Sequence, residues 1–162
     1  MAAPSEYSTA QIALHWLTAS LLVGNWIVSD GMGRVWRARM ESGATGFEGN
    51  TLHVWIGSAV LAVVLVRLVL RLVNGAPPLP SDEPALLRYG AAVSHWLLYA
   101  LMLAVPVSGA LAWYVHVRAA GGLHETLVNL LIALVALHTA AALYHRYVRR
   151  DGVLQRMVRP RA

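Results

Sequence analysis

Four apolar stretches, separated by segments rich in glycine, proline and charge, constrain this chain more than any other feature of its sequence. Each is close to the ~20 residues that an α-helix needs to cross ~30 Å of hydrocarbon. The backbone must satisfy its own hydrogen bonds in lipid, so these stretches are expected to be helices rather than strands. They are Ala10–Val28, Leu52–Val73, Ala91–Val115 and Leu123–Val148.

The composition agrees with a membrane protein, because 57% of the 162 residues are apolar and only 13% are charged. A soluble domain has about a quarter of its residues charged. The sequence therefore predicts an all-α fold, an integral membrane four-helix bundle, in a single membrane domain over residues 1–162. The first stretch is expected to be a span rather than a signal peptide, since no basic residue precedes it. Pro106 is expected to bend the third helix.

The basic side chains indicate how the bundle is oriented. All thirteen are arginines, and the formal net charge is +5. Such a surplus fits nucleic-acid binding or a membrane surface, and the apolar composition favours the membrane, so no nucleic-acid partner is expected. With the N-terminus inside, nine arginines lie on the inner side and four on the outer, which predicts that both termini are cytoplasmic. The inner arginines are Arg67, Arg71, Arg88, Arg146, Arg149, Arg150, Arg156, Arg159 and Arg161, and the outer ones are Arg34, Arg37, Arg39 and Arg118.

Six of the seven histidines lie in or at the edge of the apolar stretches, and only His116 is expected in a loop. Ionisable groups inside membrane spans are rare and usually functional. A lone histidine is explained equally well by a hydrogen bond to a carbonyl of a neighbouring helix, but six together favour a functional role. The six are His15, His53, His95, His124, His138 and His145.

Depth along the helices sorts four of these histidines into two pairs. His15 and His138 each lie eight residues from the aromatic or basic residue at the inner interface, which places both ~12 Å below the inner surface. His53 and His124 both open their helices at the outer edge. His124 and His138 are 14 residues apart, or ~21 Å along one helix and ~40° around it. This spacing is too long for one metal ion and predicts two separate centres.

The residue types narrow the choice of metal group. The absence of cysteine excludes thiolate-bound zinc and iron–sulfur clusters. The spans hold almost no carboxylate apart from Glu125 beside His124, which disfavours zinc. Haem takes axial histidines from both sides of its ring in an apolar envelope, and facing helices of a bundle provide such pairs. Gly24, Gly57 and Gly109 leave room for a flat macrocycle, although close helix packing explains them as well.

Four stretches resemble the bacterial cytochrome b561 family, whose members are four-helix membrane proteins with two b-type haems. They are YSTAQIALHW at Tyr7–Trp16, LHVWIGSAVLAVVLVRLVLRL at Leu52–Leu72, HWLLYALMLAVPVSG at His95–Gly109 and LHETLVNLLIALVALHTAAALYHRY at Leu123–Tyr147, and they cover most of the chain in order. The sequence is similar, more distantly, to the cytochrome b subunits of hydrogenases and formate dehydrogenases. The resemblance implies a bacterial inner membrane protein in which His15 and His138 hold an inner haem b and His53 and His124 an outer haem b.

Four further side chains are candidate cofactor contacts at the inner level. His95 and His145 either replace a member of the inner pair, bond to a haem propionate or line a quinone pocket. Arg67 and Arg71 lie at the inner end of the second span, and their guanidinium groups suit propionate carboxylates. Snorkelling of the side chain to the interface explains Arg71 equally well.

The function favoured by these features is electron transfer across the membrane, since two bis-histidine haems leave no open iron position for oxygen chemistry. The resemblance implies quinone, with ubiquinone as the expected acceptor. For some members it also implies oxidation of superoxide at the outer face, a superoxide:ubiquinone oxidoreductase activity. Arg34, Arg37 and Arg39 are balanced by nearby acids, but a local arginine cluster could steer a small anion.

Two other functions stay open. The chain could be a membrane anchor that relays electrons to quinone from a soluble periplasmic redox protein. In a different class, the histidines could conduct protons or metal ions through a non-redox bundle.

Overall fold

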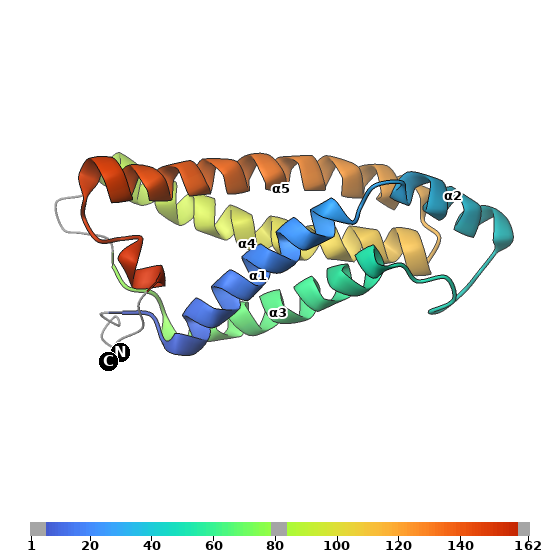
Figure 1. Cartoon of the computed structure of the whole chain (residues 1–162), viewed down its shortest axis with the longest axis horizontal. Coiled ribbons are helices and arrows are strands. Elements are labelled where there is room, and N and C mark those ends of the chain that lie inside the picture. The colour runs from blue at the N-terminus through green and yellow to red at the C-terminus, as the bar shows by residue number, and fades with distance from the viewer. Residues whose placement is uncertain (1–5, 79–83, 159–162) are drawn as a thin grey trace.

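The computed structural model describes residues 6–78 and 84–158, and every regular element in this part of the chain is a helix, as the sequence predicts (Figure 1). Arg159 and Arg161, which the charge count places on the inner side, lie outside the described residues. The α-helices are α1 (Thr9–Ile27), α2 (Met32–Ser42), α3 (Leu52–Asn74), α4 (Ala85–Tyr114) and α5 (Arg118–Tyr144), and α5 continues as a π-helix (His145–Arg149) before a short 3-10 turn (Gln155–Met157).

The helices that correspond to the four predicted spans are present. Among the described residues, α3, α4 and α5 with its π-turn are each long and apolar enough to cross a membrane. The first span passes the same test only as α1 together with α2, two helices bent by 75° at a short break. The chain is therefore a multi-span membrane protein, and lipid is its surrounding medium.

Local sequence explains where the spans begin. The side chain of Ser8 accepts from the backbone N–H of Gln11, and the Gln11 side chain accepts from the N–H of Ser8, a reciprocal cap for α1. The Thr51 side chain caps α3. Helix α4 starts directly after Pro84, six residues before the predicted start at Ala91. A helix can extend beyond the apolar stretch that spans the membrane. Pro106 lies inside α4, which runs on as one helix to Tyr114.

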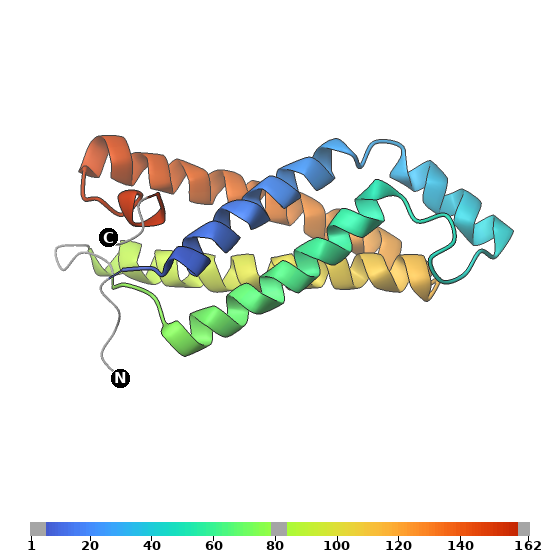
Figure 2. The same ribbon diagram turned by 60° about the horizontal axis from the view of Figure 1, so that its bottom comes forward.

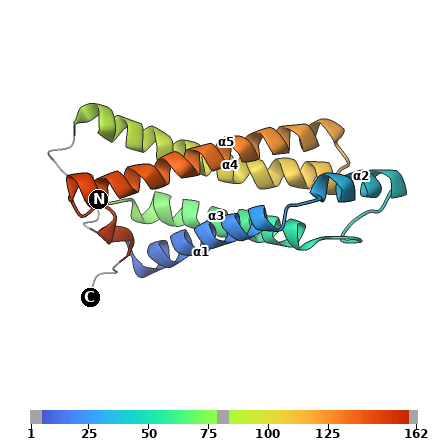
Figure 3. The same cartoon turned by 45° about the horizontal axis from the view of Figure 1, so that its top comes forward.

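The four long helices pack as two pairs, α1 with α3 and α4 with α5 (Figure 3), and α3 packs on α4 to join the pairs. Most large apolar side chains remain exposed on the outside of the bundle, and only 6% of the most apolar part of α5 is buried within the chain. That exposed apolar surface is available to lipid tails. The small buried core is made by Val60, Val64, Leu98, Leu101, Met102 and Leu131.

Helix α2 lies in the segment Ser29–Asn50, where the sequence indicates only a polar connection. The start of α1 and the C-terminal 3-10 turn lie at one end of the bundle, which we call the inner end, and α2 lies at the opposite, outer end (Figure 1, Figure 2). Gly31 and Gly43 flank α2 with φ angles of 75° and 68°, which glycine adopts without strain.

Two side chains dock α2 onto the end of α4. Trp36 Nε1 donates to the Ala112 carbonyl at 3.1 Å, and Arg39 Nε donates to the Trp113 carbonyl at 3.0 Å. Both carbonyls belong to the last turn of α4, where no intrahelical donor is available. The Arg39 guanidinium also lies 4.6 Å from the centre of the Trp113 ring and donates to the carbonyls of Gly46 and Glu48. Arg39 is 5% exposed, so it is not available to steer an anion, contrary to the expectation for the three loop arginines.

Gly121 of α5 provides a direct test of this docking. A Cβ atom at Gly121 would lie 2.9 Å from the Trp36 ring, whereas a Cβ at Gly122 would meet no atom within 4 Å. We expect Gly121→Ala to displace Trp36 and to loosen α2 at a cost of about 1–3 kcal/mol. Hydrogen exchange of residues 32–42 measures the effect.

Gly122→Ala is the matched control, since both changes replace a glycine by alanine in the same helix. Equal exchange of α2 in the two variants would contradict the docking described for Trp36.

Candidate functional site

The outer pair of histidines comes together between α3 and α5. The ring centres of His53 and His124 are 6.2 Å apart, and the rings are perpendicular. Nδ1 of His53 lies 3.2 Å from the Asn25 carbonyl, and Nδ1 of His124 lies 2.8 Å from the Val105 carbonyl. A carbonyl can only accept, so each Nδ1 carries the proton and each Nε2 keeps a free lone pair. This is the arrangement in which a histidine is held ready to bind a metal.

Gly109 creates the space that His124 occupies. A Cβ atom at this position of α4 would lie 3.0 Å from the His124 ring. Ser108 Oγ lies 3.4 Å from His124 Nδ1, and Ser108 itself is buried. The two adjacent residues therefore fix both the position and the orientation of the His124 ring against α4.

The inner end of the bundle brings together three histidines. The ring centres of His15 and His138 are 6.4 Å apart with an angle of 57° between the rings. The His95 ring lies edge-on to the His138 ring, with 5.2 Å between the centres. Arg67 Nη2 lies 3.1 Å from His15 Nδ1, and the Arg67 guanidinium is 5.7 Å from the centre of the Tyr99 ring.

The ring separations allow a test of metal binding. An imidazole nitrogen binds a metal at about 2.0–2.1 Å and the ring centre lies about 1.1 Å behind it, so two rings on opposite sides of one metal are about 6.3 Å apart. The separations of 6.2 Å for His53–His124 and 6.4 Å for His15–His138 match this value, and 5.2 Å for His95–His138 does not.

The number of protein ligands also bears on the kind of group that fits. Within the described residues, no group of three or more His, Cys, Asp or Glu side chains is arranged to hold a metal ion. A bare ion needs three or four protein ligands, whereas a haem iron takes four nitrogens from its own ring and two axial ligands from the protein. The histidine pairs in their apolar surroundings therefore fit haem.

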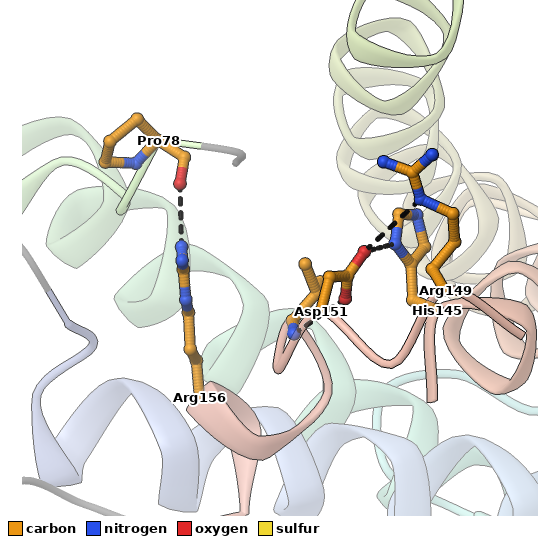
Figure 4. Close-up of polar contacts among 6 residues, drawn as sticks. Pro78, His145, Arg149, Asp151 and Arg156 are labelled. Atoms are coloured by element: carbon orange, nitrogen blue, oxygen red, sulfur yellow. Dashed lines mark hydrogen bonds and ion pairs between the residues drawn. The ribbon is translucent and has the colours of Figure 1, made fainter. Parts of the chain in front are cut away.

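His145 is not brought to the inner cluster. Its Nδ1 contacts the Asp151 carboxylate at 2.5 Å, and Arg149 lies 3.9 Å from the same oxygen (Figure 4). The C-terminal segment is held at the inner end by two further bonds, from Arg156 to the Pro78 carbonyl and from Trp16 to the Met157 carbonyl. The structure therefore gives His145 a role in anchoring this segment.

The candidate Arg71 and the loop histidine His116 also lie outside the histidine pairs. Arg71 stands one turn beyond Arg67, in the last turn of α3, and its charge acts on His95, but among the described residues it makes no hydrogen bond to a histidine of the inner cluster. His116 lies in the loop between α4 and α5, as expected, with a φ angle of 58°, and its Nε2 is buried without a partner in the described part of the chain. The sequence did not single out Asn25, Ser108 or Tyr99. For Ser108 and Tyr99 a polar side chain inside an apolar stretch was the available signal, whereas Asn25 acts through its backbone carbonyl, which any residue has.

Asp151 gives the C-terminal segment a dependence on pH. Partial burial raises the pKa of Asp151, but hydrogen bonds from His145 and Val153 and the charge of Arg149 together bring it below its ordinary value of 3.8. A carboxyl with a lowered pKa stabilises the folded state above about pH 4, and this stabilisation is lost as the pH falls through the lowered pKa.

We expect Asp151→Asn to release the C-terminal segment at neutral pH and to remove its dependence on acid. Hydrogen exchange or limited proteolysis of residues 145–158, compared between pH 7 and pH 3, measures both effects. If residues 145–158 of Asp151→Asn were as well protected from exchange and proteolysis at pH 7 as those of the wild type, this role of the carboxylate would be contradicted.

The membrane-spanning helical fold, with facing histidine pairs that fit haem, indicates the class of protein: a membrane cytochrome. The profile of the family described as prokaryotic cytochrome b561 matches residues 6–160, and the chain belongs to this family. It is a membrane b-type cytochrome, its prosthetic group is haem b, and it transfers electrons.

Curated relatives cover nearly the whole chain. The chain is 38% identical over 158 residues to cytochrome b562 of Cereibacter sphaeroides, covering 96% of each chain. It is 28% identical over 178 residues to a protein of Yersinia pestis named probable superoxide oxidase CybB, covering 94% of this chain and 96% of the relative. It is 26% identical over 179 residues to cytochrome b561 homolog 2 of Escherichia coli, covering 96% of this chain and 92% of the relative.

Proposed function

We propose that this cytochrome carries two haems b and passes electrons across the bacterial inner membrane, from a donor at the outer face to the quinone pool. The observation that carries the proposal is the pair of ring separations, 6.2 Å and 6.4 Å, at two levels of the bundle. One histidine of each pair lies on α5, 14 residues apart, so a single helix connects the two levels.

In this proposal His53 and His124 hold the outer haem, and His15 and His138 hold the inner one. Each haem supplies a one-electron carrier. Each haem would take both of its protein ligands from one histidine pair, which would leave no open iron position for oxygen. The carbonyls of Asn25 and Val105 keep the proton on Nδ1 of the outer histidines and so present Nε2 inward.

Arg67 has the position of a partner for an inner haem propionate. Its guanidinium lies among apolar helices, and its neighbours are the His15 and Tyr99 rings, neither of which is a carboxylate. A charge inside a membrane is costly unless it is paired. A bidentate carboxylate contact suits guanidinium geometry. Arg71 lies closer to the interface and is the second candidate for this contact.

For the electron acceptor and donor we propose ubiquinone and superoxide. The charge count supports an orientation with both termini in the cytoplasm, so that α2 faces the periplasm. The name of the Yersinia relative supports superoxide as the first donor to test. Arg34 and Arg37 remain exposed on α2 and can attract a small anion.

Purified protein tests the proposal directly. We expect a red protein with about two haems b per chain, low-spin in the oxidised state, as bis-histidine ligation requires. Superoxide should reduce the haems, and added ubiquinone should reoxidise them. A colourless protein after expression with ample haem would contradict the haem assignment. Reduction only by a soluble redox protein would replace superoxide with a protein donor, and the chain would then be a membrane anchor relaying electrons.

A further inference from the structure

His95 stands beside the inner pair and has a fixed position. Its Nδ1 lies 2.6 Å from the Ala91 carbonyl, one turn earlier on the same helix α4. The carbonyl can only accept, so the proton is on Nδ1 and the ring is held in one orientation. The edge contact with His138 is nearly perpendicular, at 83°. The His95 ring is therefore held in one orientation and contacts His138, a proposed haem ligand.

His138 lacks the hydrogen bond that orients the outer ligands. His53 and His124 each have a carbonyl partner at Nδ1. Within the described part of the chain, neither ring nitrogen of His138 makes a hydrogen bond, and its ring contacts are those with His15 and His95. An axial histidine usually has a second partner that fixes its ring plane. At His138 the remaining candidate for this task is the neighbouring His95 ring.

We propose that His95 is a positioning residue that sets the ring plane of His138 and thereby tunes the inner haem. This inference rests on the proposed function, in which His15 and His138 are the inner ligands. It assigns the ligand role to His138, because the His15–His138 separation of 6.4 Å fits two rings on opposite sides of one metal, whereas the His95–His138 separation of 5.2 Å does not. Because the His95 ring is fixed on α4, its contact limits the rotation of the His138 side chain on α5.

The expected consequence is spectroscopic. The signal of a low-spin ferric haem in electron paramagnetic resonance depends on the angle between its two axial imidazole planes. The inner rings make an angle of 57° and the outer rings 90°, so the two haems should give separate signals. A change in the His138 ring plane should shift the inner signal and the inner midpoint potential and leave the outer ones unchanged.

Two variants of the full-length protein test this role. His95→Ala removes the ring, and we expect a shifted, broadened inner signal and a shifted inner potential, with the outer haem intact. His95→Phe restores a ring edge without the bond to Ala91, and we expect a smaller shift and two haems per chain. His145→Ala is the control, because it removes an inner-end histidine that does not contact His138.

Three outcomes would overturn the proposal. An unchanged inner signal in His95→Ala would show that His95 does not orient His138. Loss of the inner haem in His95→Phe would make His95 a ligand. Equal shifts in both variants would assign the effect to the Ala91 hydrogen bond and remove the role of the ring edge. Failure of the proposed function is distinguishable, because the unmodified protein would then lack two low-spin signals.

Discussion

His124→Ala and His53→Ala are each expected to remove the same haem, lowering the content from about two haems per chain to about one. The reason is that the two rings face each other from α5 and α3 with 6.2 Å between their centres. When one histidine of the pair is lost, a single histidine remains to hold the haem, and a cavity is left where the other ring stood. His15→Ala and His138→Ala should remove the other haem, which has its own spectrum and potential.

Haem quantification and redox titration of the purified variants measure this pattern. The double variant His53→Ala with His124→Ala should lose no more haem than either single variant, because both act on one site. His116→Ala is the control, since His116 lies in the α4–α5 loop and belongs to neither pair. If His138→Ala kept both haems, the inner assignment would be wrong.

The second large effect is expected from Arg67→Gln, which should lower the midpoint potential of the inner haem. A positive charge near a haem stabilises the reduced form, which carries one more electron. For an assumed separation of about 8 Å between the guanidinium and the haem, and an effective dielectric constant of about 20, one charge stabilises the reduced form by about 2 kcal/mol. For a one-electron couple this is on the order of 90 mV.

Arg71→Gln is the matched control for this measurement. Arg71 lies in the last turn of the same helix, whereas Arg67 is the arginine that contacts His15. We expect a smaller shift of the inner potential in Arg71→Gln and an unchanged outer potential in both variants. Equal shifts in the two variants would contradict the special position of Arg67 beside His15.

The main histidine contacts followed from helix geometry alone. A rise of ~1.5 Å per residue places His15 level with His138, and His53 level with His124, and the rings do meet in those combinations. The three spans formed by α3, α4 and α5 followed from apolar length, and the first predicted stretch corresponds to α1, which reaches the length and apolarity of a span only together with α2. These properties depend on distance along single helices, which the sequence specifies directly.

Other features depend on packing between helices and could not be obtained in this way. His95 and His145 have similar predicted depths, yet His95 meets His138 while His145 turns to Asp151. Helix α5 changes to a π-helix at His145, so the regular angular spacing of an α-helix does not continue there. The carbonyl partners of the histidines, and the docking of Arg39 on Trp113, each need a neighbouring segment whose position no local pattern encodes.

Helix α5 contributes one member to each histidine pair, whereas α1 and α3 each contribute to a single pair. The spacing between the two levels is thus set by 14 residues of one continuous helix. Loops, bends and the packing of other helices do not enter it. In the proposed two-haem arrangement the rate of electron tunnelling falls steeply with the distance between the levels, and a covalent spacer of this kind would protect that rate from conformational changes elsewhere in the protein.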